Sequence, residues 1–270
     1  MKVLLTNDDG IQATGLNELR RALLDVPGLD LAVIAPNANR SATARSITTR
    51  RPLEVEEVEF GDGTVGYACD GTPVDCVRLA ALGLTGDGPD LIVSGINHGS
   101  NLGDDITYSG TVAAALEGIV LGVPGIAVSQ QSQAREMDFR LGEEFDFGEA
   151  AAFAARLVEE IERVPLPEGT LLNINVPGGD PDGVAVSRLG KRIYQDSLDV
   201  VEEEDGRKRF RIYGDDPSYH QEVGTDFAAV ADGLIAVTPL HFDLTSIGAL
   251  EELGGFDLDG LIRPAAHEVE

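Results

Sequence analysis

The sequence predicts an α/β fold in which a mostly parallel sheet is covered by helices on both faces. Short apolar runs, typical of strands buried on both sides, alternate along the chain with segments whose apolar residues recur at helical spacing. Segments in this order form βαβ units, whose crossovers are right-handed. The chain has 270 residues, 43% of them hydrophobic, which is enough for a sizeable core. We therefore expect one domain over residues 1–270.

The first part of the chain begins with two strands separated by a helix. Residues 3–6 form a short apolar run that predicts a buried strand. Leucines at helical spacing place a helix over about 15–25, and the run LAVIA at 31–35 predicts a second strand, which Pro36 ends. Two alternating runs within 53–69, separated by Gly-Asp-Gly, indicate a hairpin.

The central part continues the alternation around a glycine-rich loop. Thr72-Pro73 opens a helix, with a hydroxyl at the N-cap and proline at the first helical position. Residues 91–94 (LIVS) predict the next strand, and a long loop covers 95–110. Residues 112–119 then predict a helix with one apolar face, and IAVS at 126–129 predicts another strand.

The last part contains a helix and two strands with a charged insertion. Apolar spacing predicts a helix over 147–162, and the runs at 171–176 and 234–237 predict strands of the same sheet. Residues 190–224 are charged, with a turn signal at Asp205-Gly206 followed by an alternating run. We expect this stretch to be a β-hairpin arm that projects from the core and serves oligomerisation; a solvated loop is the alternative.

The composition disfavours two classes of partner. Lys and Arg number 20 and Asp and Glu number 47, so the net charge of −27 repels nucleic-acid backbones and anionic lipid. No apolar run approaches the roughly 18 residues that span a bilayer, and the N-terminus lacks the pattern of a signal peptide. Cys69 and Cys76 form no disulfide framework or CxxC motif. We expect a cytoplasmic protein with buried free thiols that binds neither nucleic acid nor membrane.

The excess of carboxylates also bears on the solvent in which the chain folds. Among the 20 basic residues only Lys2, Lys191 and Lys208 are lysines, and the chain has no tryptophan. Such a composition is typical of halophilic proteins, in which molar salt screens the repulsion between surface carboxylates. An ordinary acidic enzyme is the alternative.

Two adjacent carboxylates follow the first predicted strand, in the sequence Asn7-Asp8-Asp9-Gly10. In open α/β sheets, ligands bind beyond the carboxyl ends of the strands. Paired carboxylates there need a compensating positive charge, and their oxygens suit Mg²⁺, Mn²⁺ or Ca²⁺. The same residues also make a good Asx-type turn with both carboxylates in solvent. The four residues alone favour neither interpretation.

Two further polar loops follow strands and would reach the same edge of the sheet. Residues 36–46 (PNANRSATARS) offer small polar side chains and the guanidinium groups of Arg40 and Arg45, so the loop can ligate a metal through oxygen or hold a phosphate; a polar surface loop is the alternative. Residues 94–111 (SGINHGSNLGDDITYSGT) offer neutral oxygens in Asn97 and Asn101. This loop leads into a helix at Ser109-Gly110-Thr111, where backbone N–H groups and the helix dipole favour an anion.

Other polar residues of the glycine-rich loop are expected to have structural roles. His98 is expected to face solvent, with donation to a leaving oxygen as the alternative. Asp104 and Asp105 are expected to form a solvated turn, with support of the loop or of a metal's water shell as the alternative. Ser109 lacks a GxSxG elbow, so a helix N-cap and phosphate donor is preferred to a nucleophile. Carboxylates, neutral oxygens and an anion-binding helix end at one edge are what metal-assisted phosphoester hydrolysis requires.

These motifs closely resemble those of the SurE family, the stationary-phase survival proteins that act as metal-dependent 5′/3′-nucleotidases. The resemblance rests on NDDG after the first strand, NRSA after the second, and SGINHGSNLGDDITYSGTVAAALEG after a later one. The strings LNINVP at 172–177, GTDFAAV at 224–230 and TPL-x-x-DLT at 238–245 extend it over essentially the whole chain.

The resemblance implies a Rossmann-like, three-layer core with a C-terminal swapped β-hairpin arm, assembled as a homodimer or homotetramer. It also implies one divalent cation per subunit, Mg²⁺ or Mn²⁺. The implied ligands are Asp8, Asp9, Ser41 and Asn97. The family usually has glycine after that serine, where this chain has Ala42. If the position needs a positive φ, Ala42 strains the loop slightly.

The combined prediction is a phosphomonoesterase that hydrolyses nucleoside 5′- and 3′-monophosphates through a metal-activated water, with short polyphosphate as a side substrate by family analogy. Asp8 or Asp9 is expected to orient or deprotonate the water. The phosphate is expected to be held by the start of a helix and one amide, namely Ser109, Gly110, Thr111 and Asn101. One alternative is a haloacid-dehalogenase-like phosphatase that forms an aspartyl-phosphate, although that family needs Asp-x-Asp. The other is a non-catalytic metal- or nucleotide-binding module.

Salt dependence is the first testable consequence, because it follows from the net charge alone. At about 0.1 M salt the Debye length is about 10 Å, so neighbouring surface carboxylates still repel one another. We expect native circular dichroism and phosphate release to be lost in dilute buffer and to recover in molar potassium chloride. Full activity and an unchanged unfolding temperature in dilute buffer would contradict the halophilic interpretation.

Overall fold

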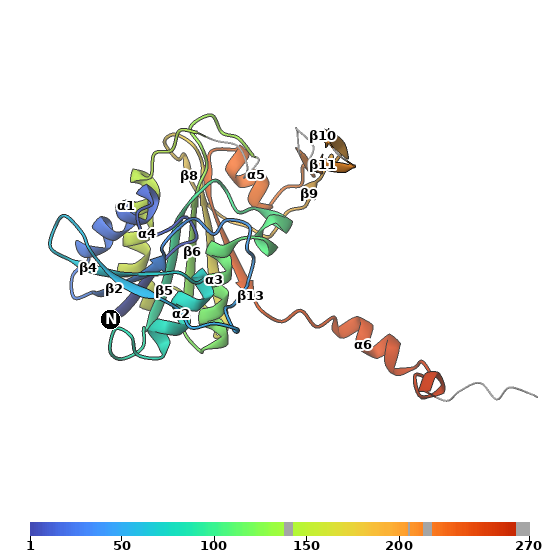
Figure 1. The fold of residues 1–270 in the computed structure, drawn as a ribbon, viewed down its shortest axis with the longest axis horizontal. Coiled ribbons are helices and arrows are strands. Elements are labelled where there is room, and N and C mark those ends of the chain that lie inside the picture. Colours follow the sequence, from blue (N-terminus) through green and yellow to red (C-terminus); the bar gives the residue numbers. More distant parts are fainter. Residues whose placement is uncertain (138–142, 205, 213–217, 263–270) are drawn as a thin grey trace, which may run out of the picture.

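The computed structural model describes residues 1–137, 143–204, 206–212 and 218–262. Nine strands form the central sheet: β1 (Lys2–Thr6), β2 (Asp30–Pro36), β3 (Val55–Glu59), β4 (Val65–Cys69), β5 (Leu91–His98), β6 (Gly125–Gln130), β7 (Thr170–Val176), β8 (Gly183–Val186) and β13 (Leu234–His241). Their order in the sheet is β3-β4-β2-β1-β5-β6-β7-β13-β8 (Figure 1). The strands from β4 to β7 along this order run parallel, as predicted.

The antiparallel strands lie at the two edges of the sheet. β3 pairs antiparallel with β4, which confirms the predicted hairpin, and β13 pairs antiparallel with β7 and parallel with β8. Strand β1 lies in the interior, with β2 on one side and β5 on the other. The chain leaves β1 in one direction and later returns to its other side, so the strand order switches between β1 and β5. Ligands of doubly wound sheets bind at such a switch point.

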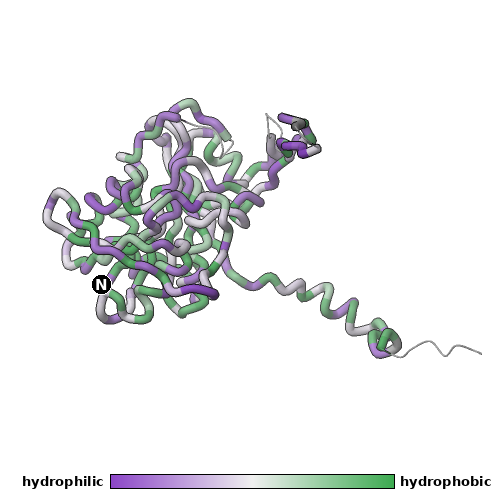
Figure 2. Tube along the Cα trace, in the orientation of Figure 1, coloured by the Kyte–Doolittle hydropathy of each residue, from purple (hydrophilic) through white to green (hydrophobic). Residues whose placement is uncertain are grey.

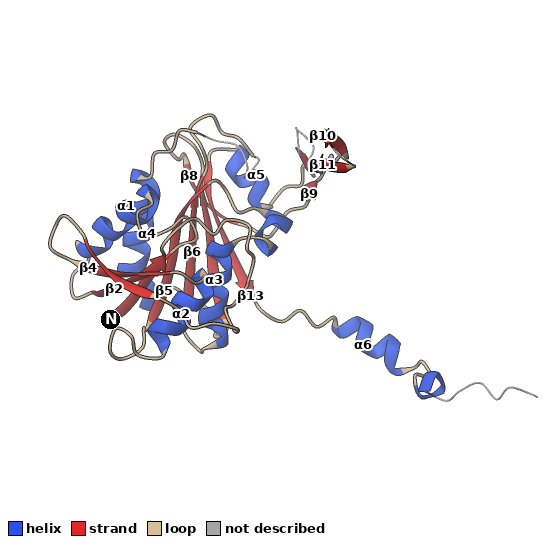
Figure 3. Ribbon diagram, in the orientation of Figure 1, coloured by secondary structure: helices blue, strands red, loops and turns tan. Residues whose placement is uncertain are grey.

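Helices cover both faces of the sheet, which confirms the three-layer α/β fold (Figure 3). They are α1 (Thr14–Leu24) and α4 (Gly148–Glu159) on one face, and α2 (Pro73–Ala81) and α3 (Gly110–Val120) on the other. Successive side chains of β1 point to opposite faces of the sheet, and each face is covered by its own pair of helices. Val3 and Leu5 pack with α1 and α4, whereas Leu4 packs with α2 and α3. Cys69 and Cys76 are buried and free, as expected.

The starts of α2 and α3 follow the predicted capping chemistry. The Thr72 hydroxyl accepts a hydrogen bond from the backbone N–H of Asp75, the Asp75 carboxylate accepts one from the Thr72 N–H, and Pro73 occupies the first turn. At α3, Ser109 Oγ accepts from the backbone N–H of Val112 at 3.1 Å. Ser109 is therefore an N-cap, as predicted.

The charged insertion forms paired strands that project from the body (Figure 1). They are β9 (Arg192–Ile193), β10 (Asp199–Glu204), β11 (Arg207–Arg211) and β12 (Ser218–Tyr219). β10 pairs antiparallel with β11, and β9 pairs antiparallel with β12. The β10–β11 pair confirms the predicted hairpin, although Asp205 of the predicted turn lies outside the described residues.

Several elements were not predicted because each is short or lacks a clear period. They are β8, α5 (Asp226–Ala231), α6 (Ile247–Gly254) and three 3₁₀ turns at Gly103–Thr107, Ile161–Arg163 and Asp259–Ile262. Helix α6 stands away from the body, and hydrophobic residues recur along it (Figure 2). Its residues Ile247, Leu250 and Leu253 are exposed. Among the described residues, no helix has both the length and the apolar character needed to cross a bilayer.

Gly15 offers a test of how closely α1 approaches the sheet. A Cβ added at this second residue of α1 would lie 2.2 Å from the carbonyl oxygen of Ile96 in β5. A backbone atom cannot move aside as a side chain can, so Gly15→Ala should lower the free energy of unfolding by about 1–3 kcal/mol. It should do so although alanine is favoured over glycine in helices by about 1 kcal/mol. Denaturant unfolding measures the change.

Gly248 provides the matched control. It is also the second residue of its helix, α6, and a Cβ there would meet nothing within 4 Å. Gly248→Ala should leave stability unchanged or raise it slightly. If the two alanine variants unfold at the same denaturant concentration, the close approach of α1 to β5 is wrong.

Candidate active site

The Asn7–Gly10 segment follows β1, and it combines the predicted Asx-type turn with the predicted pair of carboxylates at the end of the strand. The Gly10 N–H donates to Asn7 Oδ1 at 3.1 Å, and Asn7 Nδ2 donates to the Gly10 carbonyl at 3.0 Å, so the Asx-type turn is present. The carboxylates are nevertheless not in solvent. Asp8 is 3% exposed and the Asp9 side chain is 10% exposed. The turn therefore serves to bury the carboxylate pair at the edge of the sheet.

Asp8 is held by the first turn of α3. Thr111 Oγ1 donates to Asp8 Oδ1, and the Gly110 N–H also bonds to this carboxylate. A Cβ on Gly110 would lie 2.7 Å from Asp8 Cβ, so only glycine lets the helix approach so closely. Thr111 Oγ1 also lies 3.4 Å from Asn97 Oδ1. The structure thus brings Asp8, Asn97, Gly110 and Thr111 together, although they come from three different segments.

Asp9 is held from two other segments. Its Oδ1 accepts a hydrogen bond from Asn39 Nδ2 at 3.2 Å. Its Oδ2 accepts from the backbone N–H of His98 at 3.2 Å and lies 2.9 Å from His98 Nδ1. The expectation that His98 faces solvent is wrong, because its side chain is 30% exposed and contacts a site carboxylate. The contacts of His98 and Asn39 with Asp9 were not predicted from the sequence.

The loop after β2 lies at the surface and is tied to the site by hydrogen bonds. The Arg40 N–H donates to the Asp8 carbonyl at 2.6 Å, and the Ser41 N–H donates to Asn39 Oδ1 at 2.8 Å. Ser41 is therefore two residues from the Asn39 side chain that contacts Asp9, and it is exposed at the rim of the site. Most of residues 36–46 are exposed or half-buried, so the description as a polar surface loop also holds, and the role of Ser41 as a metal ligand stays a prediction.

The two guanidinium groups of this loop bind protein groups. Arg40 donates to the carbonyls of Asp70 and Gly71 at 3.1 and 3.2 Å. Arg45 donates to the buried carboxylate of Glu117 at 2.6 Å. Both arginines therefore fix the loop through protein contacts, and binding of a phosphate by this loop stays a prediction.

Ala42 adopts the positive φ that the sequence analysis raised for this position. Its φ is +57°, and that of Ala44 is +51°, so both lie in the left-handed region. A non-glycine residue there costs about 1–2 kcal/mol. The positive φ at Ala42 confirms that alanine strains the loop at this position.

The two asparagines of the glycine-rich loop lie in different surroundings. Asn97 Nδ2 donates to the Gly99 carbonyl at 2.7 Å, which directs its Oδ1 toward the Thr111 hydroxyl. Asn101 is buried, and its Nδ2 donates to Ser129 Oγ at 2.8 Å. Asn97 therefore joins the carboxylate pair. The hydrogen bonds of Asn101 anchor the loop to the neighbouring strands, and its contact with phosphate stays a prediction.

Asp105 departs from the expected solvated turn. It is buried, forms an ion pair with Arg192, and accepts a hydrogen bond from Tyr194 Oη at 2.9 Å. Asp104 is exposed and accepts from the Arg192 N–H at 3.2 Å. The partners lie almost 90 positions away at the base of the arm, where no local pattern reveals them. Asp104 and Asp105 therefore support the glycine-rich loop, which was the alternative to a solvated turn.

The electrostatics of the site favour a cation. Burial, together with the charge of Asp9, raises the pKa of Asp8 to about 6. In the part of the chain that the structure describes, His98 is the basic side chain paired with these carboxylates, and no Lys or Arg pairs with them. Across the same residues, no cluster of three or more His, Cys, Asp or Glu forms. Two carboxylates with neutral oxygens fit Mg²⁺ or Mn²⁺ better than a metal that prefers nitrogen or sulfur.

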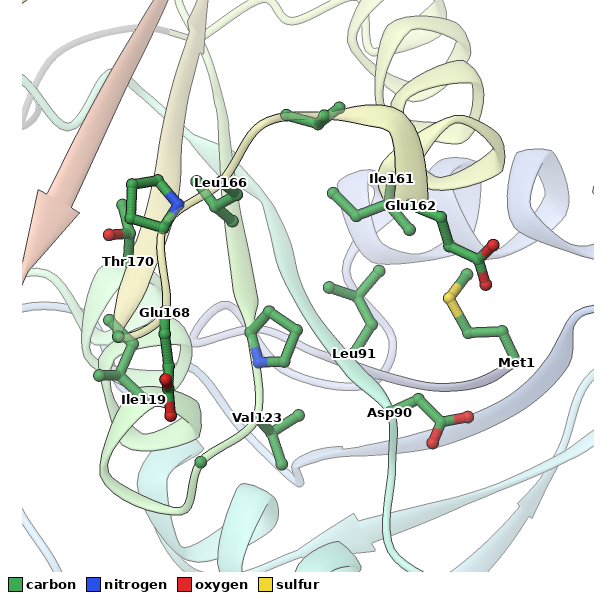
Figure 4. Close-up of a pocket in the computed structure, with 15 residues that line it drawn as sticks. Met1, Asp90, Leu91, Ile119, Val123, Ile161, Glu162, Leu166, Glu168 and Thr170 are labelled. Carbon is green, nitrogen blue, oxygen red and sulfur yellow. The ribbon is translucent and has the colours of Figure 1, made fainter.

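A pocket of about 880 Å³ lies at the other end of the parallel strands, where β5 and β7 begin (Figure 4). It is bordered by the start of β5 at Leu91, the start of β7 at Thr170, and apolar side chains such as Ile119, Ile161 and Leu166. None of the predicted site residues lines it. The candidate active site is therefore the polar cluster at the carboxyl ends of β1 and β5.

Comparison with known proteins agrees with the fold and the motifs. The family model described as "Survival protein SurE" matches residues 3–196. A protein from Rubrobacter xylanophilus named 5′-nucleotidase SurE is 52% identical over 266 residues, which cover 97% of this chain and 99% of that protein. A protein of the same name from Chloroflexus aggregans is 48% identical, covering 94% of this chain and 98% of its own. The crystal structure of SurE protein from Aquifex aeolicus matches with a TM-score of 0.77 and 36% identity, covering 94% of this chain and all of that one.

Burial of Asp8 makes stability depend on pH in the metal-free protein. The pKa of Asp8 is about 6 in the folded state and near 3.9 in an unfolded chain, so the folded state binds the proton more tightly. Stability should therefore fall as pH rises from about 4 to about 6 and stay lower above that. Asp8→Asn removes this effect, and its free energy of unfolding should exceed that of the wild type by about 3 kcal/mol at pH 7, with the two converging near pH 4.

Urea unfolding across this pH range, in molar salt with a chelator, measures the difference between the two proteins. Asp232→Asn, at an exposed position, is the matched control and should track the wild type. If the difference between Asp8→Asn and wild type did not vary with pH, Asp8 would not be a buried titrating group.

Proposed function

The chain belongs to the SurE family, and from this premise we propose that it is a 5′-nucleotidase, a phosphomonoesterase that acts with a divalent cation on nucleoside 5′-monophosphates. Relatives named 5′-nucleotidase SurE, 52% and 48% identical over nearly the whole chain, support the activity. The observation that carries the proposal is that Asp8 and Asn97 meet at Thr111 in the first turn of α3, while Asp9, the next residue after Asp8, pairs with His98, the next residue after Asn97. Nucleoside 3′-monophosphates are proposed as further substrates, and short polyphosphate as a side substrate.

Four oxygen donors are proposed to hold one Mg²⁺ or Mn²⁺ per subunit: Asp8, Asp9, Asn97 and Ser41. Asp8 and Asn97 both lie within hydrogen-bond distance of the Thr111 hydroxyl, and Asp9 pairs with His98, the residue after Asn97. Ser41 stands at the rim of the site, in a loop that the Arg40 N–H ties to the Asp8 carbonyl. When bound, a divalent cation would polarise a phosphoryl oxygen and lower the pKa of a water molecule.

The start of α3 is proposed to hold the phosphate. Ser109, Gly110 and Thr111 form the N-cap and first two positions of a helix that has no acidic residue in its first turn. Its N-terminal N–H groups and dipole favour an anion, and they would stabilise charge that grows on the equatorial oxygens during transfer. The Asn101 amide is proposed to assist from the adjoining loop.

Asp8 or Asp9 is proposed to orient the attacking water and accept its proton. The water oxygen bonds to phosphorus, the ester P–O bond breaks, and the nucleoside oxygen leaves with a proton. Asp8 is held by two donors at the start of α3, and Asp9 is held by donors on two segments, so both carboxylates are already oriented for this role.

Self-association of the chain is part of the proposal. The β10–β11 hairpin, within the arm at 190–224, exposes Val200, Val201 and Phe210. Such apolar side chains on a projecting element fit a second copy of the chain better than water. We propose a homodimer or homotetramer, a single domain over 1–270, and a halophilic, cytoplasmic setting in keeping with the composition.

The central experiment measures phosphate release from a panel of nucleoside monophosphates with Mg²⁺, Mn²⁺ or chelator, in molar potassium chloride. Asp9→Asn and Asn97→Ala should each lower metal-dependent release by more than about 100-fold, the upper end of what outer-shell changes cost. Circular dichroism should show that both variants stay folded. Asp232→Asn, exposed on the body, is the control and should keep wild-type activity.

Three outcomes would contradict the proposal. Retained release in Asp9→Asn and Asn97→Ala would remove the site. A phospho-aspartate trapped on Asp8 or Asp9 and found by mass spectrometry would favour the haloacid-dehalogenase-like route. Binding of Mn²⁺ with no phosphate released from any nucleotide would favour a binding module.

A further inference from the structure

His98 ends β5 and makes two contacts with the same oxygen of Asp9. The backbone N–H donates to Asp9 Oδ2 at 3.2 Å, and the ring Nδ1 lies 2.9 Å from that oxygen. An ionised carboxylate only accepts, so the ring nitrogen is the donor. Asn39 Nδ2 donates to the other oxygen, Oδ1, at 3.2 Å. The Asp9 carboxylate is thus held at both oxygens, from β5 and from the loop after β2.

The imidazole of His98 is itself fixed by two aromatic rings. Phe145 and Phe147 both meet it edge to face, with centroids 5.4 and 4.8 Å away and interplanar angles of 82° and 75°. The two phenylalanine rings stack on each other, and Phe147 is buried in the main core. The position of Nδ1 is therefore set by core packing, and the ring has little freedom to turn from Asp9.

We propose that His98 is a positioning residue that uses this core-anchored ring to fix the Asp9 carboxylate in the orientation that binds the cation. The inference rests on the proposed function in that it requires a cation at Asp8 and Asp9. Groups that orient a metal ligand from outside typically contribute 10–100-fold to metal affinity. His98 acts on the ligand, and it needs neither to bind the cation nor to touch the substrate.

Three substitutions separate the hydrogen bond from the packing. His98→Phe keeps an aromatic ring against Phe145 and Phe147 but removes the donor. His98→Asn removes the ring but keeps an amide donor near the position of Nδ1. His98→Ala removes both, while the backbone N–H to Asp9 remains in every variant. His220→Ala is the control, because His220 is exposed and, among the described residues, its hydrogen bonds are made by its backbone.

The readout is the dissociation constant for Mn²⁺, from the electron paramagnetic resonance signal of free Mn²⁺ titrated against each protein in molar potassium chloride. We expect His98→Phe and His98→Ala to weaken binding about 10-fold or more, and His98→Asn and His220→Ala to stay within about 3-fold of wild type. In the presence of chelator, His98→Phe should unfold at a higher temperature than His98→Asn, because thermal stability depends on the packing of the ring against Phe145 and Phe147. A crystal structure of metal-free His98→Phe should show the Asp9 carboxylate turned from its wild-type orientation.

Wild-type affinity in His98→Phe, or equal losses in His98→Phe and His98→Asn, would overturn the inference. Failure of the inference and failure of the proposed function give different results. If wild type binds Mn²⁺ and the ranking holds but no nucleotide is hydrolysed, His98 positions Asp9 in a protein with another activity. If wild type hydrolyses nucleotides and all His98 variants bind Mn²⁺ equally, the inference is wrong and the function stands. Absence of Mn²⁺ binding by wild type would overturn both.

Discussion

The fold has to hold two neighbouring carboxylates, Asp8 and Asp9, side by side at the end of an interior strand. Each is met by neutral donors or by an imidazole: Thr111 and Gly110 for Asp8, Asn39 and His98 for Asp9. Such hydrogen bonds lower the cost of burial without cancelling two negative charges. The raised pKa of Asp8 reflects this cost, first through its burial and second through repulsion by Asp9. A cation at the proposed site would relieve this unfavourable free energy, which the folded chain already carries.

The strand order explains why donors from distant segments reach the pair. β1 lies between β2 and β5, so the segments that follow all three strands meet at one edge of the sheet. Two glycines then allow the helices to close on this edge. Gly15 lets α1 lie against the Ile96 carbonyl, and Gly110 lets α3 lie against Asp8. Side chains at either place would push a helix away from the residues that it has to position.

Sequence reasoning could recover the parts of this arrangement that local chemistry encodes. Apolar runs and helical spacing gave the strands and helices of the layers, and Ser109 was recognisable as an N-cap because hydroxyl capping is local. The pairing of His98 with Asp9 and of Asp105 with Arg192 was not predictable, since each joins residues almost 90 positions apart. Helix α6 was missed for another reason. It is short, and its apolar residues are exposed on the described chain, so neither a core nor a long period marks it.

The loop that carries Ser41 shows how the fold offsets local strain with distant contacts. Ala42 and Ala44 lie in the left-handed region, each at a cost of about 1–2 kcal/mol. Arg40 on one side is hydrogen-bonded to the Asp70 and Gly71 carbonyls, and Arg45 on the other is paired with Glu117, which is 1% exposed. A carboxylate this buried would be costly without its guanidinium partners, so the pair resists separation. The two arginines therefore hold a strained loop at the rim of an acidic site, and Ser41, between them, is kept beside the carboxylates.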